Sequence, residues 1–345
     1  MDRGPRLRAH RAFRALAVAA TVVISAAACA GGGGGASESV RLGYQTNVWG
    51  MPVYTAIKDG CFQKENIPIQ EIQVDSGNRV RDLMVAEKAD VGTFAGPTMN
   101  TGMDKSDIVA VGMVGTVAAT SAIVARADSA VRSLADLRGK KIAAQSGNSI
   151  SDVATHQILS SAGLHEGDYQ LVNIPVNNMV SALAQKQVDA MVNVEPYNAI
   201  AVAQGIGRRI VDYTNYDPMP VFIGMRQGFI DQHHDQAVRI LRALLANAQE
   251  WQKNPQAITD EITRYYTSIG FKVPPEVIKD SVSRLKVQVG YFDGIEQYMR
   301  TLAERQKQLG QIGDIPDYSK TLNRSLLAEA SANTGGPSAG CSSSL

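Results

Sequence analysis

The strongest constraint on the fold comes from two similar segments that lie about one hundred residues apart. In residues 90–97 and again in residues 189–196, an aspartate is followed by a short apolar run and then by a proline. A helix-like segment precedes each of them. A short apolar run before a proline indicates a buried strand that leads into the first turn of a helix. Two such α/β halves predict a cleft between them, although a single matched interval also arises by chance.

Short apolar runs alternate with helix-like segments from residue 39 to residue 213. This alternation, with short connections, favours a mostly parallel sheet covered by helices. Beyond residue 229 the sequence predicts helices as far as about residue 327. The predicted strands are 40–44, 69–74, 91–94, 108–114, 141–144, 171–174, a strand that starts at 188, and 209–213, and the predicted helices among them include 51–58, 80–88 and 150–162.

Two further apolar runs, 118–124 and 219–225, are predicted to carry the chain into a second α/β unit and back. Two crossings predict two α/β lobes that close by a hinge on a cleft between them. The last residues are rich in Gly, Ser and Pro, a composition typical of disorder. The expected parts are lobe 1 (39–117 plus 224–330), lobe 2 (118–223) and a disordered tail (331–345).

The N-terminus has the charge order and the length of an export signal. Five arginines precede an apolar, alanine-rich run at 15–28, which is too short to span a membrane as a mature helix. The run ends at Cys29, where a bacterial lipoprotein would be cleaved and acylated, although alanine replaces the usual leucine at position 26. We therefore expect a lipoprotein signal peptide at 1–28, lipidation of Cys29 and a flexible Gly-rich tether at 29–38. The alternative is an ordinary secretory signal cut after an Ala-x-Ala site.

Composition argues against two classes of site. The formal net charge of the 345 residues is +1, and removal of the signal would leave a slightly acidic chain without a basic patch. We therefore expect no nucleic-acid surface. The sequence also has no CxxC pair, no His/Cys cluster and no HExxH motif, so we expect no metal ion and no other cofactor.

Two cysteines follow Cys29 in the sequence. Cys61 lies in a context typical of a helix end, and Cys341 lies in the Gly/Ser-rich tail. An oxidising compartment would permit a disulfide between them, but a core position and a disordered tail make a poor pair. We therefore expect Cys61 to be a small core residue.

Several segments together resemble one family, over nearly all of residues 39–310. They are Leu42-Gly43-Tyr44-Gln45 with Trp49, Lys58-Asp59-Gly60-Cys61-Phe62, Lys88-Ala89-Asp90-Val91-Gly92, residues 133–142, Gln145-Ser146-Gly147-Asn148-Ser149, and Val188-Asp189-Ala190 leading to Glu195-Pro196-Tyr197. The sequence resembles the periplasmic solute-binding proteins of ABC importers, in the branch that binds sulfonates, taurine, nitrate and thiamine precursors. The resemblance implies a type II periplasmic-binding-protein fold, a monomer that closes on a small polar solute, and delivery to an ABC permease and its ATPase.

Two strand-to-helix turns are candidate binding sites for an oxyanion. Asn148 and Ser149 lie where a strand leads into a helix, and Gly96, Pro97 and Thr98 occupy the equivalent place in the first half. Free backbone N–H groups at a helix start, together with the helix dipole, can bind an oxyanion. Asn148 and Ser149 are equally suited to cap the helix, so both roles stay open.

Four other residues are candidates at the mouth of the cleft. Gln45 and Trp49 follow the first strand, where an aromatic wall for a solute and ordinary packing are both reasonable roles. Glu195 and Tyr197 flank Pro196 at the end of the strand that starts at 188. A carboxylate there would bind an amine, which indicates a zwitterion or a polar heterocycle. The alternative is a solvated carboxylate that the helix dipole favours.

Two other functions remain open. A solute sensor that reports to a membrane receptor would share all of these features. A pyrimidine-synthase-like enzyme would share the fold, but its cysteine-rich iron motif is absent and the sequence shows no recognisable catalytic motif. We therefore expect a protein that is not an enzyme, extracytoplasmic and lipid-anchored to the cell membrane.

Overall fold

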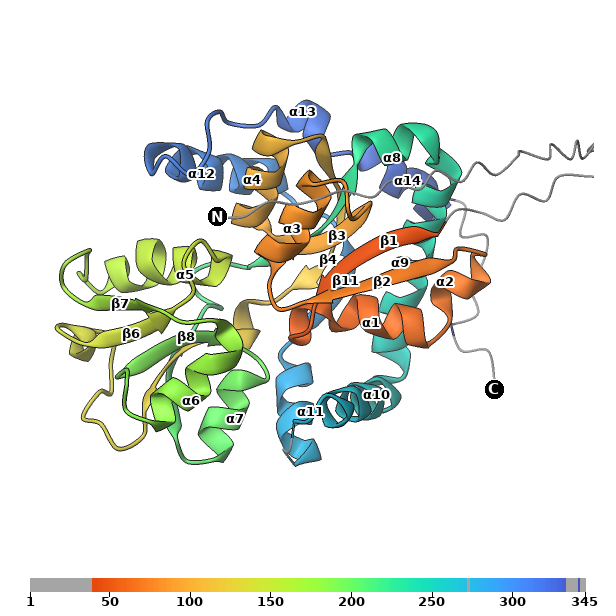
Figure 1. The fold of residues 1–345 in the computed structure, drawn as a ribbon. Helices are drawn as coiled ribbons and strands as arrows, with labels where there is room; N and C mark the ends of the chain where they lie inside the picture. Colours follow the sequence, from red (N-terminus) through yellow and green to blue (C-terminus); the bar gives the residue numbers. More distant parts are fainter. Residues whose placement is uncertain (1–38, 272–273, 333–340, 342–345) are drawn as a thin grey trace, which may run out of the picture. The chain divides into compact units, whose positions relative to one another are not determined.

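The strands of the chain form two separate sheets, each with helices packed against it (Figure 1). The computed structural model describes residues 39–271, 274–332 and 341. Within them, the six-stranded first sheet has the order β11 (Lys286–Gly290), β4 (Ile108–Thr116), β10 (Pro220–Arg226), β3 (Val91–Ala95), β1 (Val40–Gln45) and β2 (Ile69–Val74). The five-stranded second sheet has the order β7 (Gln170–Asn173), β6 (Lys141–Ala144), β8 (Ala190–Val194), β5 (Ser121–Arg126) and β9 (Gly207–Asp212).

Helices follow most of the strands and also form the C-terminal part of the chain. None of those within the described ranges is long and apolar enough to cross a membrane. The helices are α1 (Met51–Lys58), α2 (Cys61–Lys64), α3 (Gly77–Val85), α4 (Gly96–Lys105), α5 (Ser149–Val153), which continues as a π-helix at Ala154–Leu159, α6 (Met179–Ala184), α7 (Tyr197–Ala203), α8 (Gln227–Gln232), α9 (His234–Lys253), α10 (Pro255–Ser268), α11 (Pro275–Ser283), α12 (Ile295–Gln308), α13 (Tyr318–Thr321) and α14 (Arg324–Ala332).

Each sheet combines parallel and antiparallel strands. In the first sheet β1 is parallel to β2 and β3, and in the second sheet β6 is parallel to β7 and β8. The strands that enter from the other sheet, β5 and β10, are antiparallel to their neighbours. Most strands of each sheet therefore run in the same direction, as the alternation of strands and helices predicts, and the strands that run the opposite way are β5 in the second sheet and β10 and β11 in the first.

The chain passes between the sheets twice, as the sequence predicts. Residues 117–120 join β4 to β5, and residues 213–219 join β9 to β10. All of β10 pairs with strands of the first sheet, so the chain has returned there by Pro220. The return is therefore earlier than the lobe boundary expected after residue 223.

One strand is missing from the sequence-based prediction. The sequence predicts a helical region at residues 286–290, but these residues form β11 at the edge of the first sheet, antiparallel to β4. The alternation of Val287 and Val289 with polar residues is the pattern of a half-buried strand. This alternating run is short and lies between two helical segments, so it is easily assigned to the surrounding helices.

The central strands of both sheets are fully buried. Every residue of β3 and of β8 is buried, which explains their nearly continuous apolar sequences. Gly92 in β3 lets α3 approach closely, since a Cβ atom there would lie 2.4 Å from Cγ1 of Val80. A Cβ atom at Gly77, the first residue of α3, would likewise lie 2.9 Å from Cβ of Phe94, so the start of α3 packs near the carboxyl end of β3.

A disulfide joins Cys61 of α2 to Cys341, and both side chains are buried. The expectation that Cys61 is an unpaired core residue is therefore wrong. Residues 331 and 332 complete α14, so the predicted disorder of 331–345 does not hold at these two residues or at Cys341. The predicted signal peptide, Cys29 and the tether lie outside the described residues.

Candidate functional site

Three helices begin at the carboxyl ends of strands from both sheets. Helix α3 follows β2, helix α4 follows β3 directly, and helix α5 follows β6 after a short loop. The side chain of Asn148 accepts a hydrogen bond from the backbone N–H of Ile150 (3.1 Å), so Asn148 caps α5. The remaining N–H groups in the first turn of each helix have no intrahelical acceptor, and they carry the positive end of the helix dipole.

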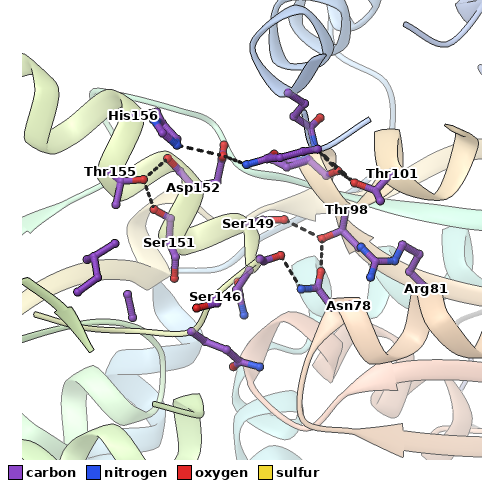
Figure 2. Close-up of a pocket in the computed structure, with 18 of the residues that line it drawn as sticks. Asn78, Arg81, Thr98, Thr101, Ser146, Ser149, Ser151, Asp152, Thr155 and His156 are labelled. Atoms are coloured by element: carbon purple, nitrogen blue, oxygen red, sulfur yellow. Dashed lines mark hydrogen bonds and ion pairs between the residues drawn. The ribbon is translucent and has the colours of Figure 1, made fainter. Parts of the chain in front are cut away.

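Side chains at these helix starts bond to one another between the two sheets (Figure 2). The hydroxyl of Thr98 donates to Oδ1 of Asn78 (2.9 Å) and lies 2.9 Å from the hydroxyl of Ser149. Nδ2 of Asn78 donates to the carbonyl oxygen of Gly147 (2.5 Å). We call these four residues the polar seal, because they connect the helices of the first sheet to the start of α5.

An inner pocket lies on one side of the polar seal. Its volume is about 10 Å³, which is about the accessible space that one water molecule needs. Of the described residues that line it, none carries a formal charge. The lining residues are Gln45, Asn47, Trp49, Ser76, Gly77, Asn78, Ala95, Thr98, Asn148, Ser149, Ile150, Val176 and Val194.

A larger outer pocket of about 600 Å³ shares Asn78, Thr98, Asn148 and Ser149 with the inner pocket. Charged side chains occur here. The further lining residues are Arg81, Pro97, Thr101, Lys105, Ala144, Gln145, Ser146, Gly147, Ser151, Asp152, Thr155, His156, Leu171, Gln306 and Gln311. The two pockets together form a site between the sheets that is uncharged at its inner end and charged at its outer end.

Gln45 and Trp49 line the inner pocket, but protein groups already bond their polar atoms. Nε2 of Gln45 donates to the carbonyl oxygen of Thr93 (2.9 Å), and the Thr93 hydroxyl donates to Oε1 of Gln45 (3.2 Å). The indole N–H of Trp49 donates to Oγ1 of Thr120 (2.8 Å), and the ring is buried. The structure thus places both as walls of the inner pocket, with their polar atoms bonded to protein groups.

Glu195 lies elsewhere, and it lines neither pocket. Its carboxylate is fully buried and forms an ion pair with Arg209 of β9. Oε2 of Glu195 also accepts hydrogen bonds from the backbone N–H of Ala199 (2.9 Å) and the hydroxyl of Ser281 (3.1 Å). The expected position at the cleft mouth, bound to a solute amine or exposed to solvent, is therefore wrong in either form. These contacts connect α7, β9 and α11.

Tyr197 and Gly96 also serve packing rather than either pocket. The ring of Tyr197 packs against Phe271, with 5.8 Å between the ring centroids, and burial raises the pKa of Tyr197 to about 12. A Cβ atom at Gly96 would lie 2.8 Å from Cδ1 of Leu302, so this glycine allows α12 to pack on α4. Of the nine predicted ligand residues, the pockets bring together Gln45, Trp49, Pro97, Thr98, Asn148 and Ser149, and not Gly96, Glu195 or Tyr197.

Asn78, Arg81 and Lys105 line the site although the sequence-based list omits them. Ser76 precedes α3 in an extended conformation, as a residue before a helix should. The segment Ser76-Gly77-Asn78 is therefore a recognisable helix start. The sequence alone does not place Arg81 and Lys105 at the site. Their positions can be inferred only once α3 and α4 are known to lie side by side.

Residues 33–265 match the NMT1-like family. A protein of Brucella abortus that is named as a binding protein is 30% identical over 154 residues, which cover 44% of this chain and 46% of that protein. The chain thus spans about half the length of this curated relative. A protein of Bacillus subtilis that is named as an aliphatic sulfonates-binding protein is 25% identical over 238 residues, 67% of this chain and 70% of that protein.

A solved structure confirms the predicted fold. The alkanesulfonate-binding protein SsuA from Xanthomonas axonopodis pv. citri, bound to MOPS, superposes with a TM-score of 0.73 at 18% identity, over 82% of this chain and 97% of that chain. At this identity the likeness shows the fold alone. The family match covers more than half of the chain and confirms the resemblance, and the chain belongs to the NMT1-like family.

Proposed function

We propose that this protein is the extracytoplasmic solute-binding component of an ABC importer, and that it captures a small solute through an oxyanion group. The observation that carries the proposal is the convergence of three helix starts, from both sheets, on an uncharged polar pocket. N–H groups at helix starts bind oxyanions without a cationic side chain. Sulfonate, the solute class in the name of the Bacillus relative, is such a group.

The same geometry argues against a solute that is held through an amine. The inner pocket is lined by hydroxyl and amide groups and has no carboxylate among the described residues. Glu195, the residue expected to bind an amine, pairs with Arg209 instead. We therefore favour a sulfonate or another oxyanion over a zwitterion bound at both charges by the inner pocket.

Capture and release would follow from movement of one α/β lobe relative to the other. The two crossings, at residues 117–120 and 213–219, are the places where such a hinge would bend. Hydrogen bonds of the polar seal join the two sides when no solute is bound, and an oxyanion would close the lobes by taking the place of these bonds. The closed protein would then be the form that a permease and its ATPase receive.

Lipid anchoring through Cys29 completes the proposal. An anchored protein would stay near its permease, and the Gly-rich residues 31–35 would give it freedom to rotate. Replacement of Cys29 with alanine should release the protein from membranes, as fractionation and immunoblotting would show. Continued membrane association of that variant would contradict the anchor. A sensor role would leave solute binding intact but would not require a permease.

A thermal-shift and calorimetry screen of the purified full chain tests the binding proposal. We expect aliphatic sulfonates to raise the melting temperature and neutral analogues of the same size to have no effect, because only a ligand of the folded state stabilises it. Ser149→Ala should weaken sulfonate binding by roughly tenfold or more, as expected for a lost hydrogen bond to a charged group. Ser283→Ala, at an exposed position of α11, is the matched control. Equal binding by Ser149→Ala and wild type would contradict this site.

A further inference from the structure

The outer pocket has a charge pattern that the proposed oxyanion site does not need. Its first-sheet wall carries two cations, Arg81 of α3 and Lys105 of α4. Its one carboxylate, Asp152, is paired with Arg305 of α12 (2.9 Å) and lies 3.8 Å from His156. The paired Asp152 cannot neutralise the opposite wall, so the pocket presents net positive charge to whatever occupies it.

Arg81 is well placed to contact an occupant of this pocket. It lies beside Asn78 and Thr98 on the first-sheet side (Figure 2), and its side chain is 13% exposed. Its ion pair is with Asp82, the next residue, whose side chain is 61% exposed (2.7 Å). That contact uses Nε and Nη2, and within the described ranges Nη1 of Arg81 makes no further ion pair or hydrogen bond. Because the Asp82 end of this pair is open to water, the pair contributes little, and the guanidinium keeps Nη1 for a second anion.

Lys105 extends the positive wall outward. It lies in the last turn of α4, where a cation also favours the helix dipole. Within the part of the chain that the structure describes, no carboxylate lies within ion-pair distance of Lys105. Leu171 of β7, in the second sheet, lines the same pocket and is 48% exposed, so it offers an apolar surface there.

The geometry points to a solute with two acidic groups: an oxyanion at the polar seal and a carboxylate in the outer pocket, against Arg81 and Lys105. This inference rests on the proposed function and names its substrate class. Arg81 follows Asn78 by one helical turn, about 5–6 Å along the surface. Lys105 follows Thr98 by two turns, about 10 Å. The two acidic groups would be separated by a short apolar spacer, such as a benzene ring or a chain of a few carbons.

Two aromatic sulfonates of similar size test this inference. 4-Sulfobenzoate carries a carboxylate where 4-toluenesulfonate carries a methyl group. In calorimetry with the purified full chain, the dissociation constant of 4-sulfobenzoate should be at least tenfold lower than that of 4-toluenesulfonate. Arg81→Gln and Lys105→Gln should each reduce that preference severalfold, whereas Lys253→Gln, which removes an exposed cation outside the pocket, should not change it. Arg81→Lys should keep part of the preference, and added salt should reduce it in wild type.

Each outcome separates this inference from the proposed function. Equal binding of the two compounds, tighter binding of 4-toluenesulfonate, or an unchanged preference in both Gln variants would overturn the inference and leave the oxyanion site standing. Failure of both compounds and of the aliphatic sulfonates to bind would overturn the inference together with the proposed function. A preference that disappears only in the variants of Arg81 and Lys105 would support it.

Discussion

Replacement of Glu195 by glutamine should destabilise the fold and leave solute affinity nearly unchanged. Both carboxylate oxygens accept from donors: one faces Arg209, and the other faces the N–H of Ala199 and the hydroxyl of Ser281. A glutamine places an NH₂ group on one of these sides, where a donor then meets a donor. The variant therefore loses the charge of the ion pair and leaves a polar group without an acceptor.

The expected loss of stability can be estimated from these contacts. A buried donor without an acceptor costs about 1–3 kcal/mol, and a lost bond to a charged group costs about the same. Arg209 is 19% exposed and can partly return to water, which lowers the sum to about 2–4 kcal/mol. With an unfolding entropy of about 2 cal/mol/K per residue and roughly 300 ordered residues, the melting temperature should fall by about 3–6 °C.

Differential scanning calorimetry would measure this shift, and isothermal calorimetry would measure binding of the sulfonate found by the screen. Glu276→Gln is the matched control, since Glu276 is exposed on α11, the helix that also carries Ser281. The reasoning is refuted if the melting temperature of Glu195→Gln equals that of the wild type. It is also refuted if the variant binds an aminosulfonate at least tenfold more weakly than the wild type does at an unchanged melting temperature. The second result would return Glu195 to a ligand role.

Three further variants test other parts of the fold. Cys61→Ser combined with Cys341→Ser should lower stability by about 2–5 kcal/mol, and reductant should lower the melting temperature of wild type but not of the double variant. Gly92→Ala should cost about 1–3 kcal/mol in urea unfolding, because its Cβ would overlap Val80, and wild-type stability would contradict the close packing of α3. Burial, together with the charges of nearby glutamates, raises the pKa of Asp59 to about 6. The folded protein therefore holds the Asp59 proton more tightly than the unfolded chain does. The stability that this proton contributes is lost as the pH rises from about 4 to about 6. Asp59→Asn should therefore raise the melting temperature at pH 7.5 and not at pH 3.5, and an equal effect at both pH values would argue against the shifted pKa.

The sequence predicts well those features that depend on neighbouring residues. The apolar runs of β3 and β8 identify buried strands because both faces of each strand are covered. Asn148 and Pro97 mark the starts of α5 and α4 because capping and the fixed proline backbone act within one turn. The position of these turns at strand ends was enough to place Thr98 and Ser149 at the site.

Features that depend on distant residues could not be predicted in this way. The side chain of Glu195 faces Ser281, more than eighty residues later, and the sequence around Glu195 holds no information about that contact. The Gly- and Ser-rich surroundings of Cys341 argue against a pair with Cys61, yet a disulfide joins these two residues. Arg81 becomes a candidate only when α3, α4 and α5 are placed around one cavity.

The hydrogen bonds within the polar seal compete with the hydrogen bonds that a solute would form with the same groups. Asn78, Thr98, Ser149 and the carbonyl of Gly147 already satisfy one another, so an incoming oxyanion exchanges these bonds for new ones rather than adding to them. The measured dissociation constant then reports the difference between two sets of hydrogen bonds. A solute that fits the pocket but cannot replace the seal gains little, since only interactions that differ between the two states shift the equilibrium. Selectivity then depends on how completely a solute replaces the hydrogen bonds of the polar seal, and not only on its fit to the pocket.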